Sequence, residues 1–207
     1  IYQLDFYIDG TLVRMKSIDA KTGEVNWIEQ RTLNGQAGLG IGLSTREDAM
    51  ETRGFSDAFN LASSQMTSHT VQLDVYGDGS LIRTKSWDVK DGLDVLGSVS
   101  YSAQVKLTDQ AGLDYGLTNI TENAVQIISY SDGSFAQNRI NGYTHQLDVY
   151  GDGSLLRTAS YFVNADGTQG ELDGSPSEIT KLDDGKTTRI FGYEDLTFTV
   201  MTSAVDQ

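Results

Sequence analysis

The sequence predicts an all-β protein, a tandem array of three antiparallel β-meander repeats of about 70–75 residues each. A twelve-residue segment occurs three times, apolar and polar residues alternate within it, and Asp-Gly or Asn-Gly dipeptides follow at short intervals. The copies begin at Gln3, Gln72 and Gln146, so their spacings are 72 − 3 = 69 and 146 − 72 = 74 residues. We expect repeat one over 1–69, repeat two over 70–143 and a truncated repeat three over 144–207.

The second copy illustrates the strands expected in each repeat. Val71, Leu73 and Val75 alternate with polar residues, which is the period of a half-buried strand. Asp78-Gly79 follows, a dipeptide that favours the two-residue type I′ turn of a β-hairpin. A returning strand over 80–87, a turn at 90–92 and a third strand over 98–107 complete the meander. Hairpins are therefore predicted over 3–16, 72–85 and 146–159, each turning at Asp-Gly.

A two-residue turn would fix the pairing of the two strands. It places Asp74 opposite Arg83 and Val75 opposite Ile82, with Leu73 on the apolar face. The opposite face then carries tyrosine, aspartate and arginine in every copy. An aromatic ring beside a carboxylate and a guanidinium suits a sugar, whereas the plainer interpretation is an ion pair on a solvated face. The candidate ligand-binding residues are Tyr7, Asp5, Arg14, Tyr76, Asp74, Arg83, Tyr150, Asp148 and Arg157.

The bulk composition restricts the classes of partner. Lys plus Arg is 15 and Asp plus Glu is 29, so the net charge is 15 − 29 = −14. This charge repels nucleic acids and anionic membranes, and no apolar run is long enough for a spanning helix. The chain has no cysteine, which excludes disulfides and zinc–thiolate sites. Because it opens at Ile1 inside a strand-like segment, we expect a processed product or a fragment of a longer protein.

Few residues suggest chemistry. The Asp-rich turns leave calcium as a candidate ligand, although Asp74 and Asp78 lack the alternating oxygen ligands of a calcium loop. The metal ligands therefore stay unassigned. The only two histidines, His69 and His145, are not equivalent in the repeats, and we interpret them as lone polar residues near the starts of strands. No catalytic triad is evident.

The segment from Tyr76 to Arg83 resembles the tyrosine–aspartate hairpin repeats of large bacterial secreted and wall-associated proteins, over about a dozen residues per copy. That resemblance implies an extracellular, non-catalytic β scaffold. We expect a non-enzymatic structural or adhesive segment of a surface or filament protein. It would pair strands with its own chain or with further copies. A carbohydrate-binding module is the alternative, and an enzyme with its site near 98–104 or 170–178 is a third hypothesis.

Overall fold

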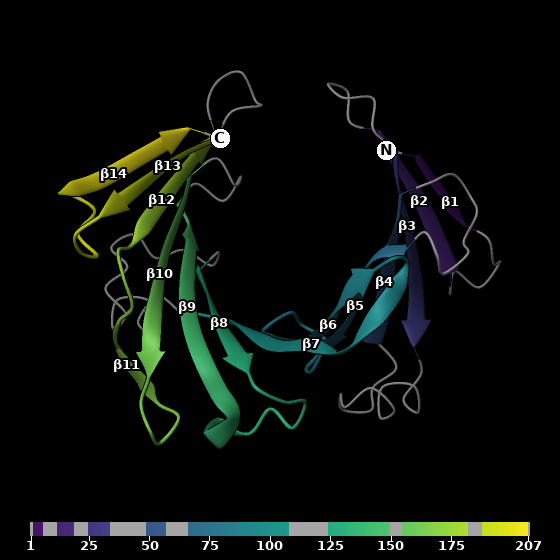
Figure 1. Ribbon diagram of the computed structural model, residues 1–207, viewed down its shortest axis with the longest axis horizontal. Coiled ribbons are helices and arrows are strands. Elements are labelled where there is room, and N and C mark those ends of the chain that lie inside the picture. The colour runs from purple at the N-terminus through teal and green to yellow at the C-terminus, as the bar shows by residue number, and fades with distance from the viewer. Residues whose placement is uncertain are drawn as a thin grey trace. The chain divides into compact units, whose positions relative to one another are not determined.

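A computed structural model describes residues 2–5, 12–18, 25–33, 49–56, 66–107, 124–149, 155–181 and 188–206. These residues form a fourteen-stranded sheet (Figure 1). Thirteen strands follow one another in chain order, and the short β11 pairs with β10 beside this path. The all-β class and the meander order are therefore confirmed.

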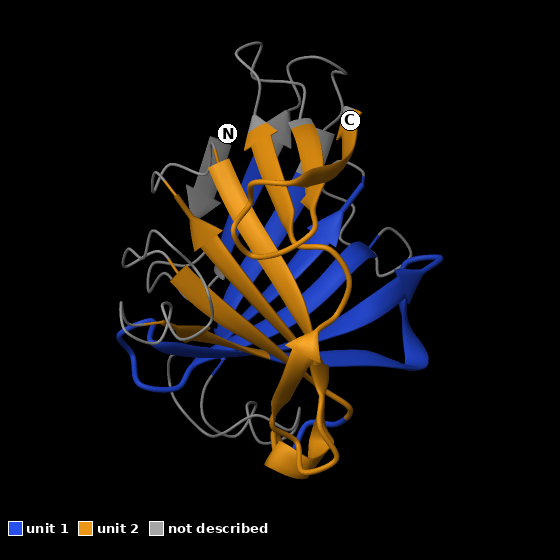
Figure 2. Ribbon diagram, turned by 90° about the vertical axis from the view of Figure 1, so that its left-hand side faces the viewer, with its two compact units in different colours: residues 1–102, 132–134 blue, residues 103–131, 135–207 orange. Residues whose placement is uncertain are grey.

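The described residues divide into two compact units (Figure 2), residues 1–102 with 132–134 and residues 103–131 with 135–207. The three-repeat division stays a prediction. The first seven strands are β1 (Tyr2–Asp5), β2 (Leu12–Ile18), β3 (Val25–Leu33), β4 (Ala49–Phe55), β5 (Met66–Asp74), β6 (Leu81–Lys90) and β7 (Leu93–Lys106). The others are β8 (Ala124–Tyr130), β9 (Ile140–Asp148), β10 (Leu155–Val163), β11 (Gln169–Leu172), β12 (Ser177–Lys181), β13 (Thr188–Tyr193) and β14 (Met201–Asp206), with a 3₁₀ turn at Gln137–Arg139 before β9.

The three expected hairpins are present as β1–β2, β5–β6 and β9–β10, but their predicted register is wrong by one residue. Asp74 lies opposite Ile82, and Arg83 lies opposite Leu73. The other two hairpins have the same pairing, with Asp5 opposite Val13 and Asp148 opposite Leu156. Since successive side chains alternate between faces, aspartate and arginine belong to opposite faces of the sheet.

The register shifts because the β5–β6 connection is longer than a two-residue turn. Val75 N–H donates to Leu81 C=O at 2.9 Å, so five residues lie between the closing pair. The Asp74 carboxylate accepts the backbone N–H groups of Gly77 and Gly79 at 2.9 and 2.8 Å. Both glycines have positive φ, 77° and 74°, which lets the backbone turn around that carboxylate.

A two-residue turn does occur one connection later. Asp91 and Gly92 both have positive φ, 53° and 78°, and they join β6 directly to β7. This is the type I′ geometry that Asp-Gly favours. The dipeptide therefore forms the predicted two-residue turn at this connection, where the upstream carboxylate of Asp88 accepts the Ser98 hydroxyl.

The buried side chains alternate along the strands and lie on one face of each unit. In the first unit, Ala49, Val71 and Leu73 are almost fully buried, at 0, 1 and 0% exposure. In the second unit, Leu147 packs with Leu107 and Ala124. A neighbouring cluster there comprises Tyr143, Ala159 and Tyr161. Ile82 and Leu156, expected beside the buried leucines, pair with aspartates and so belong to the other face.

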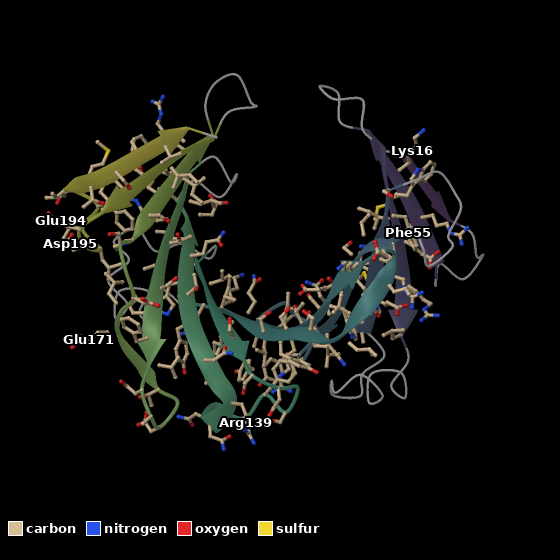
Figure 3. The ribbon with its side chains drawn as sticks, viewed as in Figure 1. Lys16, Phe55, Arg139, Glu171, Glu194 and Asp195 are labelled. Atoms are coloured by element: carbon tan, nitrogen blue, oxygen red, sulfur yellow. The ribbon has the colours of Figure 1, made fainter. Side chains whose placement is uncertain are left out.

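A β-bulge ends three strands at corresponding positions, between Gly54 and Phe55 (labelled in Figure 3), Ser129 and Tyr130, and Gly192 and Tyr193. At each bulge one glycine lies opposite one serine: Gly54 and Ser68, Ser129 and Gly142, Gly192 and Ser203. A Cβ atom at Gly192 would lie 2.6 Å from Ser203 Oγ, and one at Gly54 would collide with the Ser68 hydroxyl. The strands therefore approach closely at Gly54 and Gly192 because glycine has no side chain, whereas a Cβ at Gly142 would lie 3.7 Å from Ser129 Cβ, an ordinary contact.

We predict that Asp74→Ala lowers the free energy of unfolding by about 1–2 kcal/mol, because two backbone N–H groups lose a charged acceptor at a solvated site. Asp78→Ala is the matched control, since it removes a carboxylate of the same loop that accepts Ser80 N–H. Denaturant melts should show the control losing less than half as much. Equal losses would contradict the capping role of Asp74.

Candidate functional site

A polar cluster on the buried face of the first unit is formed by Glu51, His69 and Asp94. They lie on β4, β5 and β7, and Glu51 and His69 are each 8% exposed. His69 Nε2 lies 3.1 Å from Glu51 Oε1, and His69 Nδ1 lies 2.9 Å from Asp94 Oδ2. Ionised carboxylates only accept hydrogen bonds, so both ring nitrogens donate and His69 is an imidazolium.

Two arginines complete the cluster, Arg31 from β3 and Arg53 from β4, the strand that carries Glu51. Arg31 lies 2.7 Å from Glu51 Oε2, and Arg53 donates to Glu51 Oε1 at 2.9 Å. The His69 ring stacks on Trp87, with centroids 4.2 Å apart and planes 13° apart. Every charge in this cluster therefore has an opposite charge in contact, which is the condition for keeping ions on a buried face.

The contacts shift the pKa values of both central groups. The hydrogen bond from His69 is the largest influence on Glu51; with Arg53 and Arg31 it outweighs burial and lowers the Glu51 pKa from 4.5 to about 2. Burial alone would lower the pKa of His69, but the hydrogen bonds and charges of Glu51 and Asp94 together raise it above 6.5. Each group thus stabilises the charged form of the other.

A neutral counterpart occupies the second unit. Gln126 Nε2 donates to His145 Nε2 at 2.9 Å and lies 3.2 Å from Gln169 Oε1. Gln126 and Glu51 occupy corresponding places on β8 and β4. Each lies two residues after an alanine, Ala124 or Ala49. Ala124 faces Leu147, and Ala49 faces the strand of Leu73 in the corresponding register. In sequence, 126 − 51 = 75 and 169 − 94 = 75. The two carboxylates around His69 thus correspond in position to the two amides near His145, although His145 itself occupies the place of Val71.

His145 is fully buried, at 0% exposure, and its ring centroid lies 4.6 Å from that of Tyr161. Burial lowers its pKa from 6.5 to about 4, against a smaller opposite effect of the hydrogen bond with Gln169. Close by, Tyr143 donates its hydroxyl to Gly167 C=O at 2.8 Å. The two histidines were interpreted from sequence as lone polar residues. They are instead buried centres of two polar clusters, with a charged imidazole in one and a neutral imidazole in the other.

Two of the three arginines of the predicted site, Arg14 and Arg157, form cross-strand ion pairs. Arg14 Nε lies 3.1 Å from Glu29 Oε2, and Arg157 Nε lies 2.9 Å from Glu178 Oε2. Both glutamates directly face their arginines on the next strand. The guanidinium of Arg157 also lies 4.7 Å from the ring centre of Phe198. A recurring Arg–Glu pair thus links the hairpin to the following strand.

The structure does not assemble the predicted set of tyrosine, aspartate and arginine. Asp74 and Arg83 belong to opposite faces, as do Asp148 and Arg157. Tyr76 is 63% exposed beside its loop. Tyr7 and Tyr150 lie outside the described residues, and Asp5 is described only through its place opposite Val13. The prediction that aspartate and arginine share one face is wrong because it assumed a two-residue turn.

Carboxylates in the turns bind their own backbone. Asp132, Asp166 and Asp195 each accept the N–H and the hydroxyl of the residue two positions later, which is Ser134, Thr168 or Thr197. Among the residues that the structure describes, no group of three or more His, Cys, Asp or Glu side chains is placed to hold a metal ion. Calcium binding stays a prediction.

The chemistry of the His69 cluster is that of a structural network. Both imidazole nitrogens are hydrogen-bonded to carboxylates, so the ring offers no lone pair to a substrate. Alternation with Val71 and Leu73 could have identified His69 as buried from sequence, and the 75-residue offset could have matched Glu51 with Gln126. The proximity of Asp94 to His69 could not have been predicted from sequence, because it depends on where β7 lies in the folded sheet.

We predict opposite titration of the two histidines. His69 should titrate above pH 6.5 and His145 near pH 4. The stabilisation from His69 is present below pH 6.5 and lost as pH rises through its folded pKa, whereas the contribution of His145 grows as pH rises from about 4 to 6.5. NMR titration of the imidazole resonances measures both values. Equal pKa values would contradict the two charge states.

We predict that Glu51→Gln lowers the pKa of His69 and destabilises the protein by about 2 kcal/mol, because two arginines and an imidazolium lose a buried partner. Gln126→Glu is the reciprocal variant and should raise the pKa of His145. NMR titration and denaturant melts measure the two effects. A His69 pKa that does not move in Glu51→Gln would contradict the assignment of Glu51 as its partner.

Comparison of the chain with protein-family models, with curated proteins and with solved structures found no match. Within the described part of the chain, no helix has the length and apolar character needed to cross a membrane.

Proposed function

We propose that the protein is a non-enzymatic extracellular β module, a structural or adhesive segment of a larger surface or filament protein. One observation carries this proposal. Strands β4–β5–β6 and β8–β9–β10 share a pairing register, while amides replace the carboxylates of Glu51 and Asp94 and the histidine moves from the place of His69 to that of Val71. A catalytic site requires particular chemical groups, whereas a scaffold requires only that each buried polar group be satisfied.

The pattern of charge supports an architectural role. Cationic groups of the buried face contact carboxylates on adjacent strands, as in Arg14–Glu29, Arg31–Glu51 and Arg157–Glu178. Such pairs connect strands side by side instead of converging on an open site. The excess of acidic residues, at −14, would keep a surface-exposed chain soluble.

The carbohydrate-binding alternative depended on tyrosine, aspartate and arginine sharing one face. The register separates aspartate from arginine, so the structural role has the stronger geometric support. An exposed tyrosine such as Tyr76 is still available to a sugar ring, which gives the alternative a direct test.

We predict that the protein is accessible on intact cells of its source. Protease treatment of those cells, followed by immunoblotting, should remove it while a cytosolic marker survives. A glycan array should show no binding above that of Tyr76→Ala. Protection until lysis would contradict the extracellular role, and glycan binding that Tyr76→Ala abolishes would favour the alternative.

A further inference from the structure

Each of the three β-bulges adds one residue that has no partner across the bulge. In the β8–β9 bulge, Gly142 faces Ser129 and the next pair is Ile140 with Tyr130, so Asn141 is the extra residue. All three extra residues are exposed, and the other two are Thr67 and Thr202. Asn141 is therefore the one of the three that carries a side-chain amide.

Asn141 also lies outside the ladder on its other side. The register of β9 with β10 runs from Asp148 to Tyr143 and stops before Asn141. Pairing with β8 continues beyond the bulge, where Ser131 N–H donates to the C=O of Arg139 (labelled in Figure 3) at 2.7 Å. Within the described part of the chain, no hydrogen bond holds the Asn141 side chain. The amide therefore rotates without breaking a contact.

The residue after Asn141 is a glycine, and this order favours a reaction between the side chain and the backbone. The backbone nitrogen of Gly142 closes a five-membered ring on Cγ of Asn141 only when the chain leaves the extended conformation of a strand. A bulge residue departs from that conformation, and glycine lets the following peptide rotate. A Cβ at Gly142 would lie 3.7 Å from Ser129 Cβ, so the surroundings do not confine this backbone tightly. The bulge thus supplies the freedom that a regular strand would remove.

We propose that Asn141 is a site of spontaneous deamidation, with water as the only co-reactant. The Gly142 nitrogen bonds to Cγ of Asn141 and gives up its proton, while the side-chain amide takes up a proton and leaves as ammonia. Water then adds to one of the two carbonyls of the resulting succinimide and breaks the bond from that carbonyl to nitrogen. One opening gives aspartate, and the other gives isoaspartate, which adds a methylene group to the backbone of β9. Either product adds one negative charge to a chain whose net charge is −14.

Asn164 is an internal control for this reaction. Its Nδ2 donates to Thr168 Oγ1 at 3.0 Å and to Gln169 C=O at 3.1 Å, and the next residue is Ala165. Both hydrogen bonds must break before the amide reacts, and alanine has less conformational freedom than glycine. Asn164 should therefore stay intact while Asn141 reacts.

Peptide mapping by mass spectrometry tests the site after the folded protein is incubated at mildly alkaline pH. It separates Asn141 from Asn34, the other asparagine that precedes a glycine. Asn141 should convert to aspartate and isoaspartate within about tenfold of its rate in denaturant, because no side-chain contact has to open first. Asn164 should react at least about tenfold more slowly in the folded protein than in denaturant. An Asn141 that stays intact in the folded protein but reacts in denaturant would overturn the proposal.

Exchanging the glycine and the serine of this bulge tests the role of Gly142. Ser129→Gly combined with Gly142→Ser gives the arrangement of the other two bulges, Gly54–Ser68 and Gly192–Ser203. The conversion of Asn141 should slow about tenfold, because serine restricts the backbone that must rotate. Gly142→Ala is a second variant with the same expected result, since its Cβ has room.

Asn141→Thr is the matched control, because threonine is the extra residue of the other two bulges. It should abolish the product at this position, and circular dichroism should show that all variants are folded. An unchanged rate in both glycine variants would also overturn the proposal. None of these results bears on exposure at the cell surface, so failure of this site and failure of the proposed function are distinguishable.

Discussion

The carboxylate of Asp74 sets the strand register on which the buried clusters depend. By binding two backbone N–H groups inside the loop, it holds five residues between the closing pair instead of two. The register then places Leu73 opposite Arg83, and alternation carries that choice along both strands to His69 and Trp87. With the two-residue turn, Trp87 would lie on the opposite face from His69, and their stacking would be lost.

The second condition that this sheet must meet is the compensation of its buried charges. Ions removed from water destabilise a fold unless opposite charges and hydrogen bonds compensate them. In the first unit the compensation is ionic, with Glu51 shared by His69, Arg31 and Arg53. In the second unit the place of Glu51 is held by Gln126, whose neutral amide donates to His145 Nε2. Two chemically different solutions therefore fit one backbone arrangement.

The fold class, the meander order and the three hairpins could be predicted from the repeats and the alternation of residue types. The register could not, because an Asp-Gly dipeptide is compatible with several loop lengths. What decides among them is whether an upstream acceptor such as Asp74 takes the backbone N–H groups, and that contact exists only after folding. The polar clusters were missed for a related reason, since Asp94 reaches His69 from a strand 25 residues later in the chain.

The glycine–serine pairs at the bulges have a consequence for comparative sequence analysis. Glycine lies on the earlier strand at Gly54 and Gly192 but on the later strand at Gly142, each time opposite a serine. Although glycine and serine exchange strands, each pair keeps the same combined size of the two residues. Aligned repeats would therefore show two variable columns that covary, and a score computed column by column would overlook the steric requirement that Gly54 and Gly192 meet.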